Sequence, residues 1–337
     1  GDIYIGDTFE GSPVYAKDLN ASGAMAVLLK DAIKPNLVQT LEGNPAIIHG
    51  GPFANIAQGT NSILATKMGM SLGGYVVTEA GFAADLGAEK FLNIKCRKAE
   101  ISPKAVVVVA TIRALKYHGG KSLNEITQED LSALEKGIPN LEKHIEAIQS
   151  FGLPVVVSVN TFSSDTDAEK ELIYKHCEKL GVPVALSTGW AEGGKGCTDL
   201  AQKVVKAAEG NTAKFKPTYE LEDSPLTKIE KICKNIYGAN GVELSAKAKN
   251  QLKRFEDLGY SKLPICMAKT EKSLSDDEKL KGRPTNFEIH IREFEIAAGA
   301  GFIIPIAGNM LRMPGLPLTP AAENIKMNNN GDISGLF

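Results

Sequence analysis

The sequence lacks a long hydrophobic run and lacks an excess of charge of either sign. Although 43% of its 337 residues are hydrophobic, no apolar stretch approaches the ~18 residues that a membrane-spanning helix needs. The 38 Lys and Arg residues and 40 Asp and Glu residues give a net charge of -2, and they are interleaved rather than gathered into a basic block. We therefore expect small-molecule partners, no nucleic acid and no membrane.

The sequence also lacks the cysteine and histidine patterns of disulfide scaffolds and metal sites. Its cysteines are odd in number, far apart and without a C-x-x-C pair, namely Cys96, Cys177, Cys197, Cys233 and Cys266. This usage favours reduced thiols in a cytoplasmic protein. No H-x-x-x-H or H-E-x-x-H spacing is present, so no metal site is predicted. No signal or transit sequence opens the chain, and the start at Gly1 rather than Met predicts a piece of something longer.

Short β-rich apolar runs alternate with helical patterns along most of the chain. This alternation predicts an α/β fold with mainly parallel sheets and crossover helices. The run Val106–Val109 lacks polar alternation, as expected for a strand that is covered on both faces. The expected strands are Pro45–His49, Gly74–Thr78, Ala105–Thr111, Pro154–Asn160, Pro183–Ser187, Leu263–Ala268 and Phe302–Ala307.

Helix starts and connections are also marked in the sequence. Two S/T-x-x-D/E patterns predict capped helix starts at Thr127 and Thr166, and the second helix is expected to stop at Gly181. The polar stretch 210–224 reads as a link between a middle unit and a last one. The turn-rich tail 312–337 is expected to lie over the surface of the last unit.

Three aromatic side chains stand just past predicted strand ends. Only 6% of the chain is aromatic and Trp190 is the sole tryptophan, yet Phe82, Phe162 and Trp190 all lie in small or polar loops. Ligands of parallel α/β sheets bind beyond the carboxyl ends of the strands. A flat heteroaromatic ligand would gain roughly 1–3 kcal/mol per stacked ring. The alternative is that these loop aromatics fold back as lids on the core.

A glycine-rich segment, Gly189–Gly196, nearly matches the phosphate-binding pattern G-x-x-x-x-G-K-[ST]. It follows a predicted strand and precedes a predicted helix, but Gly196 replaces the hydroxyl residue that would hold Mg²⁺. Lys195 is a candidate for meeting a phosphate or carboxylate as a point charge. The alternative reading is a solvated lysine in a glycine turn.

The remaining polar candidates are less specific. His49 precedes Gly50 and Gly51, whose bare backbone suits the approach of an anion, but a strand-end histidine is also readily satisfied by local hydrogen bonds. Glu79 follows another predicted strand, where a carboxylate suits an amine or an N–H edge. His49 and Glu79 are thus the candidate catalytic residues, and Gly50, Gly51 and Lys195 the candidate cofactor-binding residues. Asp85, Asp165 and His118 have similar settings, for which capping or local bonding is an alternative.

Several of these segments resemble the formate–tetrahydrofolate ligase (formyltetrahydrofolate synthetase) family. The segment Val109–Gly120, which reads VATIRALKYHGG, is similar to a signature of that family in full. The segments His49–Ala57, Thr78–Phe91 and the terminal stretch from Met313 to Phe337 also look like family sequence. The resemblance covers essentially the whole chain.

The resemblance implies a ligase of one-carbon metabolism. Such an enzyme uses ATP, with Mg²⁺, and formate to make formyl phosphate, and then passes the formyl group to N10 of tetrahydrofolate, releasing ADP and phosphate. By the same resemblance, Phe162 and Trp190 sandwich the folate, Leu186 lines that pocket, and Phe82 lies in the cleft near substrate or nucleotide. A monovalent cation, potassium or ammonium, is expected as activator, and a homo-oligomer, a tetramer, as the assembly.

The resemblance also implies a multi-domain, P-loop-NTPase-like fold. We expect residues 1–98 to be the remainder of a nucleotide and active-site domain, 99–209 a folate-binding α/β domain, and 210–337 a smaller carboxy-terminal α/β domain. Two departures from the family matter. The family is longer, with its phosphate-binding loop in an amino-terminal part absent from this chain, and Gln58 stands where the family commonly has histidine.

The main phosphate-clamping residues are therefore expected to be absent, and the isolated chain is expected not to turn over by itself. One hypothesis is that the chain is the carboxy-terminal part of the ligase, with the P-loop on the missing amino-terminal part or on a companion polypeptide. A second is a non-catalytic folate-binding module or interaction subunit. A third is an unrelated NTPase that uses Gly189–Gly196.

Overall fold

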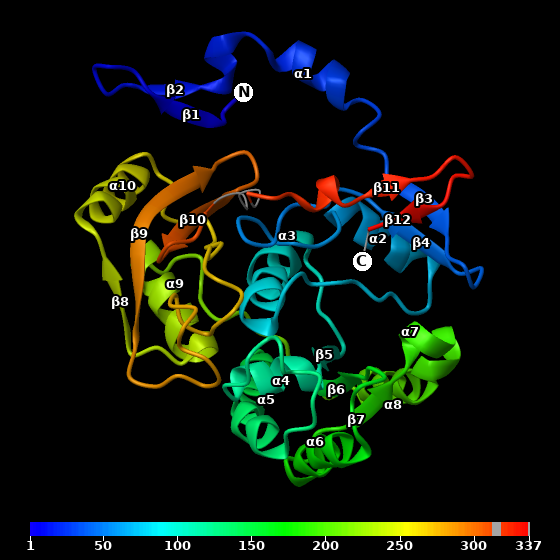
Figure 1. Cartoon of the computed structure of the whole chain (residues 1–337). Helices are drawn as coiled ribbons and strands as arrows, with labels where there is room; N and C mark the ends of the chain where they lie inside the picture. The colour runs from blue at the N-terminus through cyan, green and yellow to red at the C-terminus, as the bar shows by residue number, and fades with distance from the viewer. Residues whose placement is uncertain (312–317, 336–337) are drawn as a thin grey trace.

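The described part of the chain folds into helices and several small, separate sheets. The computed structural model describes residues 1–311 and 318–335. Within them lie two three-stranded sheets and three two-stranded ones (Figure 1). The expectation of an α/β fold is confirmed at this level, whereas a P-loop-NTPase-like fold and the division at residues 98 and 209 stay predictions. None of the described helices is both long and apolar enough to cross a membrane.

The sheet that carries the candidate site is entirely parallel. Its order is β5-β6-β7, with β5 as an edge strand. Three of the expected strands are thereby confirmed, and the connections are helical, as crossovers between parallel strands require. The elements are β5 (Val106–Ala110), α4 (Ile112–His118), α5 (Leu131–Ser150), β6 (Val155–Asn160), α6 (Asp167–Lys179), β7 (Val184–Ser187), α7 (Gly189–Glu192) and α8 (Thr198–Glu209).

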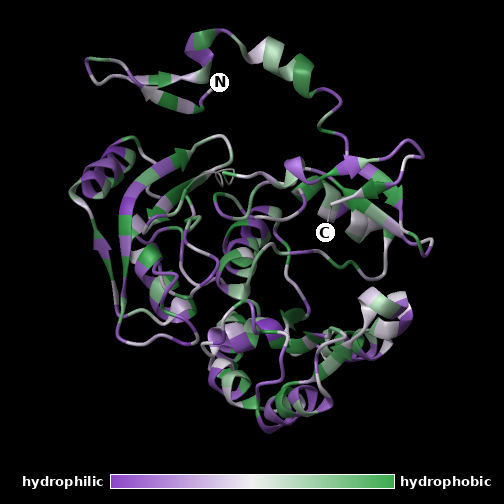
Figure 2. Cartoon of the chain, in the orientation of Figure 1, coloured by the Kyte–Doolittle hydropathy of each residue, from purple (hydrophilic) through white to green (hydrophobic). Residues whose placement is uncertain are grey.

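The second three-stranded sheet is mixed. Strand β8 pairs with β9 in parallel, whereas β10 pairs with β9 in antiparallel fashion. Figure 2 shows α10 as a largely hydrophilic helix on the outside, while β9 alternates along its length. The prediction of mainly parallel sheets thus holds for the first sheet only. The elements are α9 (Pro225–Ile232), β8 (Gly241–Leu244), α10 (Ala246–Asp257), β9 (Glu288–Ala297) and β10 (Phe302–Ala307).

The remaining elements are short hairpins and helices. The β1–β2 hairpin and α1 run along the outside of the body (Figure 1). The remaining strands and α-helices are β1 (Tyr4–Asp7), β2 (Pro13–Tyr15), α1 (Ser22–Leu29), β3 (Asn36–Gln39), β4 (Pro45–Ile48), α2 (Ile63–Leu72), α3 (Arg97–Ala99), β11 (Lys326–Met327) and β12 (Ile333–Ser334). Three π-helical turns span Ala84–Ala88, Phe91–Cys96 and Cys233–Tyr237, and three 3₁₀ turns span Ala16–Leu19, Gly193–Cys197 and Ala321–Glu323.

Three strand predictions need correction. The segment 74–78 does not form a strand: its first two residues lie in a bend and no described strand pairs with it, and a high β-propensity alone does not provide a partner strand. Strand β4 forms where expected, but it pairs with β3 in an antiparallel hairpin and so does not belong to the parallel sheet. The run 263–268 makes only isolated bridges beside β10, at Ile265 and Ala268.

The two expected helix starts have different outcomes. Thr166 caps α6, and its hydroxyl and the Glu169 carboxylate form a reciprocal capping box. The other cap is wrong by three residues, because Asp130 rather than Thr127 accepts the hydrogen bond that starts α5. Of the turn-rich tail, residues 312–317 and 336–337 lie outside the described residues, and so does that part of the family-like terminal segment.

The core is shared between the two larger sheets. Val157 of β6, Ile289 of β9 and Leu134 of α5 are fully buried, and they belong to one hydrophobic cluster. Burial of such a side chain contributes about 1.5–3 kcal/mol. The parallel sheet and the mixed sheet are therefore parts of one packed body.

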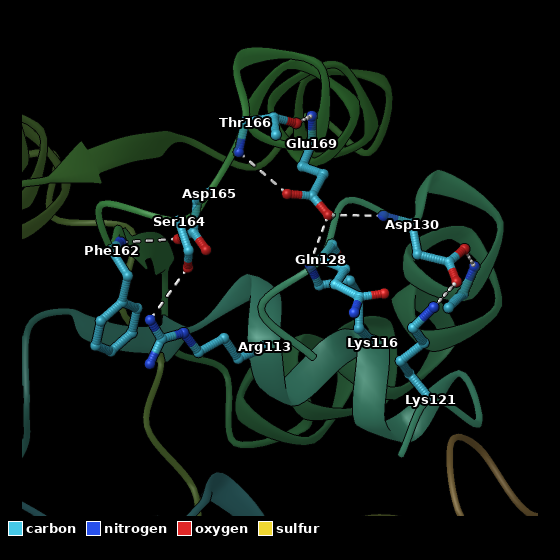
Figure 3. A network of polar contacts seen from close by, with 11 residues as sticks. Arg113, Lys116, Lys121, Gln128, Asp130, Phe162, Ser164, Asp165, Thr166 and Glu169 are labelled. Carbon is cyan, nitrogen blue, oxygen red and sulfur yellow. Dashed lines mark hydrogen bonds and ion pairs between the residues drawn. The ribbon is translucent and has the colours of Figure 1, made fainter. Parts of the chain in front are cut away.

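Two charges are buried together between α4 and α6. The Nζ of Lys116 lies 2.7 Å from the Oε1 of Glu169, and neither side chain has exposed surface (Figure 3). Lys116 also donates to the carbonyl of Gln128, and the backbone N–H of Asp130 donates to Glu169. Removing one member would leave an uncompensated buried charge.

Glu89 is a further buried carboxyl, and among the described residues no cation is in hydrogen-bond contact with it. Its Oε1 accepts a hydrogen bond from the Nδ2 of Asn93 at 2.7 Å, and its Oε2 is buried without a partner. Burial raises the pKa of Glu89 to about 7. The folded chain therefore holds on this carboxyl a proton that the unfolded chain releases at lower pH.

We predict that Lys116→Met lowers the free energy of unfolding by about 3–5 kcal/mol, because Glu169 is left buried without its cation. Urea unfolding followed by far-UV circular dichroism measures this loss. The double variant Lys116→Met/Glu169→Gln should recover part of it. Lys175→Met is the matched control, since Lys175 and Glu171 form an exposed pair worth at most about 1 kcal/mol. A loss for Lys116→Met as small as the control's would contradict the prediction.

We predict that Glu89→Gln removes a pH-dependent loss of stability. Because the folded pKa of Glu89 is raised, its contribution is fully present below about pH 4.5 and is lost as pH rises through about 7. The free energy of unfolding of E89Q relative to the wild type should therefore increase by up to about 3 kcal/mol between pH 5 and pH 8. The exposed Glu171 gives the control E171Q, whose difference from the wild type should stay flat. A flat difference for E89Q would refute the assignment.

Candidate functional site

Two aromatic side chains stand at the carboxyl ends of neighbouring parallel strands. Phe162 follows β6, and Trp190 lies on α7 directly after β7. The N–H and the hydroxyl of Thr161 both donate to the carbonyl of Ser187, which ties the two strand ends together. Leu186 on β7 is 37% exposed beside them. The structure thus brings three of the predicted substrate-binding residues to one edge of the sheet, and their role stays a prediction.

These aromatic rings do not close over the core. Trp190 is 95% exposed and Phe162 is 38% exposed. In the described part of the chain the two rings are not in contact with one another. Exposed rings of this kind are costly to leave in water, and they are suited to cover a flat apolar ligand.

The loop that carries Phe162 is held by its own polar groups. The backbone N–H of Phe162 donates to the Oδ2 of Asp165 at 2.8 Å, and the N–H of Asp165 donates back to the carbonyl of Phe162. Asp165 is buried, and the helix cap itself is the neighbouring Thr166. Asp165 therefore shapes the turn that presents Phe162, instead of capping α6.

A cavity of about 1220 Å³ lies along the open side of β5, and Phe162, Leu186 and Trp190 are not among its lining residues. It is lined by the segment 73–80, by β5, and by residues of α4, α5 and α8. No described strand pairs with the outer edge of β5, and Val109 is 65% exposed there. The expectation that this strand is covered on both faces is therefore wrong for Val109. The predicted residues Glu79 and Phe82 line the cavity.

Phe82 has a strained backbone at the rim of this cavity. Its φ angle is +64°, in the left-handed region that non-glycine residues rarely adopt. The preceding Gly81 donates its N–H to the carbonyl of Gly59, and a Cβ at Gly87 would overlap the carbonyl of Gly81. Strain of this kind persists only where the surroundings impose it, and it concentrates at functional sites.

Charged and neutral polar groups form the floor of the cavity. The carboxylate of Asp85 lies 2.8 Å from the Nζ of the fully buried Lys269 and 4.0 Å from the Nδ1 of His144. Burial alone raises the pKa of Asp85, but Lys269 and then His144 outweigh it and hold that pKa below its usual value. The floor therefore carries an ionised carboxylate that is already paired.

His118 is the second histidine that lines the cavity. Its Nδ1 accepts a hydrogen bond from the backbone N–H of Gly282. Burial lowers its pKa to about 4. His118 is therefore neutral at pH 7, with its proton on Nε2, which leaves this N–H as a hydrogen-bond donor.

The other histidine candidate is engaged locally. The Nδ1 of His49 lies 2.7 Å from the hydroxyl of Ser62, and its Nε2 lies 2.9 Å from the carbonyl of Ala32. Both ring nitrogens are therefore occupied, as expected for a strand-end histidine that is satisfied by local hydrogen bonds. Gly50 and Gly51 follow it in the connection to α2, and neither lines the cavity. The structure does not bring this group together with the rings of Phe162 and Trp190.

The glycine-rich segment 189–196 does not form a phosphate-binding loop. A helical turn, α7, and a 3₁₀ turn divide it, and α8 begins only at Thr198. The N–H of Gly194 donates to the Oε1 of Glu42 at 2.7 Å. Lys195 is exposed. Since an anionic side chain already fills the glycine surface and no hydroxyl residue follows Lys195, these residues do not fit a Mg²⁺-ATP site of this type.

Sequence reasoning missed three residues that shape the site. Arg113 lies against the ring of Phe162, Lys269 is paired with Asp85, and the Nδ1 of His144 lies 4.0 Å from the same carboxylate. A signal was present for Arg113 only, because it stands three residues after the end of β5 in the family-like segment. The contacts of Lys269 and His144 join segments far apart in the chain. Among residues 1–311 and 318–335, no three His, Cys, Asp or Glu side chains gather in a metal-binding group.

The chain was compared with models of known protein families. The model described as formate–tetrahydrofolate ligase matches residues 1–337, which is the whole of the sequence. The match agrees with the resemblance of the segments that carry Phe82, Arg113 and His118.

Proposed function

The chain belongs to the formate–tetrahydrofolate ligase family, and we propose that its residues supply the folate pocket and one wall of the cleft in which that ligation takes place. The family implies tetrahydrofolate, formate and ATP as substrates. In the proposed reaction ATP phosphorylates formate, and the formyl group of formyl phosphate passes to N10 of tetrahydrofolate, releasing ADP and phosphate.

The observation that carries the proposal is the pair of exposed rings at the ends of β6 and β7. Phe162 and Trp190 stand where ligands of parallel sheets bind. Tetrahydrofolate offers flat pterin and aminobenzoyl groups, and each stacked ring is worth roughly 1–3 kcal/mol. The exposed Leu186 on β7 adds apolar surface. The pocket therefore recognises the folate chiefly by stacking.

The cavity beside β5 is proposed as the part of the cleft nearer to formate and nucleotide. Phe82 and Glu79 line it, and so does the neutral His118, whose Nε2–H is a hydrogen-bond donor. Because the Asp85–Lys269 pair is already satisfied, its proposed role is to fix the floor rather than to exchange protons with a substrate. Apolar strand β5 and helix α8 line the remainder and exclude water from the reacting groups.

The clamp on the phosphate groups is assigned elsewhere. Residues 189–196 do not fit the phosphates of Mg²⁺-ATP, and no segment of the 337-residue sequence matches G-x-x-x-x-G-K-[ST] in full. We propose that a P-loop outside these residues, or on a companion polypeptide, supplies it. Activation by a monovalent cation, a homo-oligomeric assembly, a cytoplasmic location and the domain division at residues 98 and 209 complete the proposal.

A non-catalytic folate-binding module is the second candidate, and the missing phosphate pattern favours it. Both candidates expect the 337-residue chain to bind tetrahydrofolate without turnover. They separate when a polypeptide with the P-loop is added: formation of 10-formyltetrahydrofolate from ATP and formate supports the ligase. Turnover by the chain alone would show that the phosphate clamp lies within it.

We predict that Trp190→Ala weakens the binding of tetrahydrofolate about tenfold, because a stacked ring is lost. Isothermal titration calorimetry under reducing conditions measures the dissociation constant. In the ligase assay the KM for tetrahydrofolate should rise while that for ATP stays unchanged. Phe9→Ala is the control, since Phe9 is fully exposed in the β1–β2 hairpin. Unchanged tetrahydrofolate binding by W190A would refute the stacking assignment.

A further inference from the structure

One face of the Phe162 ring is covered by Arg113. The guanidinium carbon of Arg113 lies 4.1 Å from the centroid of the ring (Figure 3). At this distance the planar guanidinium lies against the ring, as in cation–π pairs. A flat ligand that stacks on Phe162 therefore has only the opposite face available.

Arg113 is fixed to the same loop that carries the ring. Its Nη2 donates to the hydroxyl of Ser164 at 3.1 Å. Its Nε is buried and makes no hydrogen bond in the described part of the chain. The contacts of the guanidinium thus point to the loop at 161–166, and they account for its orientation.

The loop's other contacts hold the backbone of Phe162 but not its ring. Asp165 accepts from the N–H of Phe162, and Thr161 is tied to Ser187. Neither contact restrains the side-chain torsions of a phenylalanine that is 38% exposed. No ring-to-ring contact of Phe162 exists among the described residues. Arg113 is therefore the charged group that lies against the face of the ring and restrains it.

Helix α4 holds the backbone of Arg113 in a fixed position. Thr111 caps this helix by accepting from the N–H of Ala114. One turn after the cap, the buried Lys116 holds Glu169, which closes the capping box with Thr166 at the start of α6. Two cations of one helix therefore hold the two ends of the same loop, Arg113 at the ring and Lys116 at the following helix.

We propose that Arg113 is the positioning residue of the folate platform, the stacking surface formed by Phe162 and Trp190, and that it acts by holding Phe162 with one face open to tetrahydrofolate. This inference rests on the proposed function, because it assigns the open face to the folate. Holding the ring before the ligand arrives removes the entropy cost of ordering it on binding. A lysine at this position keeps the charge but lacks the planar fork that both covers the ring and reaches Ser164.

A double-mutant cycle on tetrahydrofolate binding tests this role. Quenching of the sole tryptophan, Trp190, reports the dissociation constant in every variant. We expect Arg113→Met to weaken binding about threefold or more, Phe162→Ala about tenfold, and Arg113→Met/Phe162→Ala no further than Phe162→Ala. Arg113→Lys should lie between Arg113→Met and the wild type. Arg283→Met, which removes an arginine from the pair with Glu146, is the control and should bind normally.

Two outcomes of the cycle overturn the inference. Normal binding by Arg113→Met, with weakened binding by Phe162→Ala, shows that the ring needs no support from Arg113. Equal weakening by Arg113→Met in both backgrounds shows that Arg113 acts on the ligand rather than through Phe162. Far-UV circular dichroism identifies any variant that fails to fold, and Arg113→Lys then replaces Arg113→Met in the cycle.

A measurement without ligand separates this inference from the proposed function. The chain is labelled with 4-fluorophenylalanine, and the ¹⁹F resonance of Phe162 is assigned with Phe162→Leu. Arg113→Met should shift and narrow this resonance, whereas Arg283→Met should not. If Phe162→Ala binds tetrahydrofolate normally, the folate platform is wrong, and the ¹⁹F resonance alone then decides whether Arg113 holds the ring. An unchanged resonance in Arg113→Met overturns the inference in either case.

Discussion

The ion pair between Lys116 and Glu169 is the interaction on which the geometry of the site depends. Neither side chain reaches solvent, so the pair must be kept together or the charges are left without compensation. It joins α4, which follows β5, to α6, which follows β6. The loop of Phe162 connects β6 to α6, so its position depends on how α6 is held. A buried charge pair in this place fixes the register of two crossover helices and, through them, the aromatic edge of the sheet.

The site has two parts with different physical character. At the ends of β6 and β7, exposed rings on well-held loops suit the stacking of a flat ligand. Along β5 the cavity is mostly apolar, and its polar floor consists of groups that are already paired or neutral, such as Asp85 and His118. The family's reaction needs one region that binds the folate and another that shields the reacting groups from water.

Much of the fold that carries the site could be predicted from the sequence. The β-branched runs at 106–110 and 155–160 and the capping box at Thr166 are local signals, and the structure confirms them. The segment 74–78 has the same β-branched character but no partner strand, so composition alone misassigned it. The pairing of β4 with β3 was missed for the same reason, since hydrogen bonding between strands is a property of the pair.

By itself the sequence determined the family, the parallel α/β unit and the positions of Phe162 and Trp190 after strand ends, because short motifs and local periodicity carry that information. Only the tertiary structure decided which of the candidate groups are available to a ligand. His49 is satisfied by Ser62 and Ala32, and Gly194 already binds Glu42 from a hairpin far away in the chain. Arg113 gains its role by lying on a ring 49 positions later. Contacts between distant segments depend on how the elements pack, and no local pattern records them.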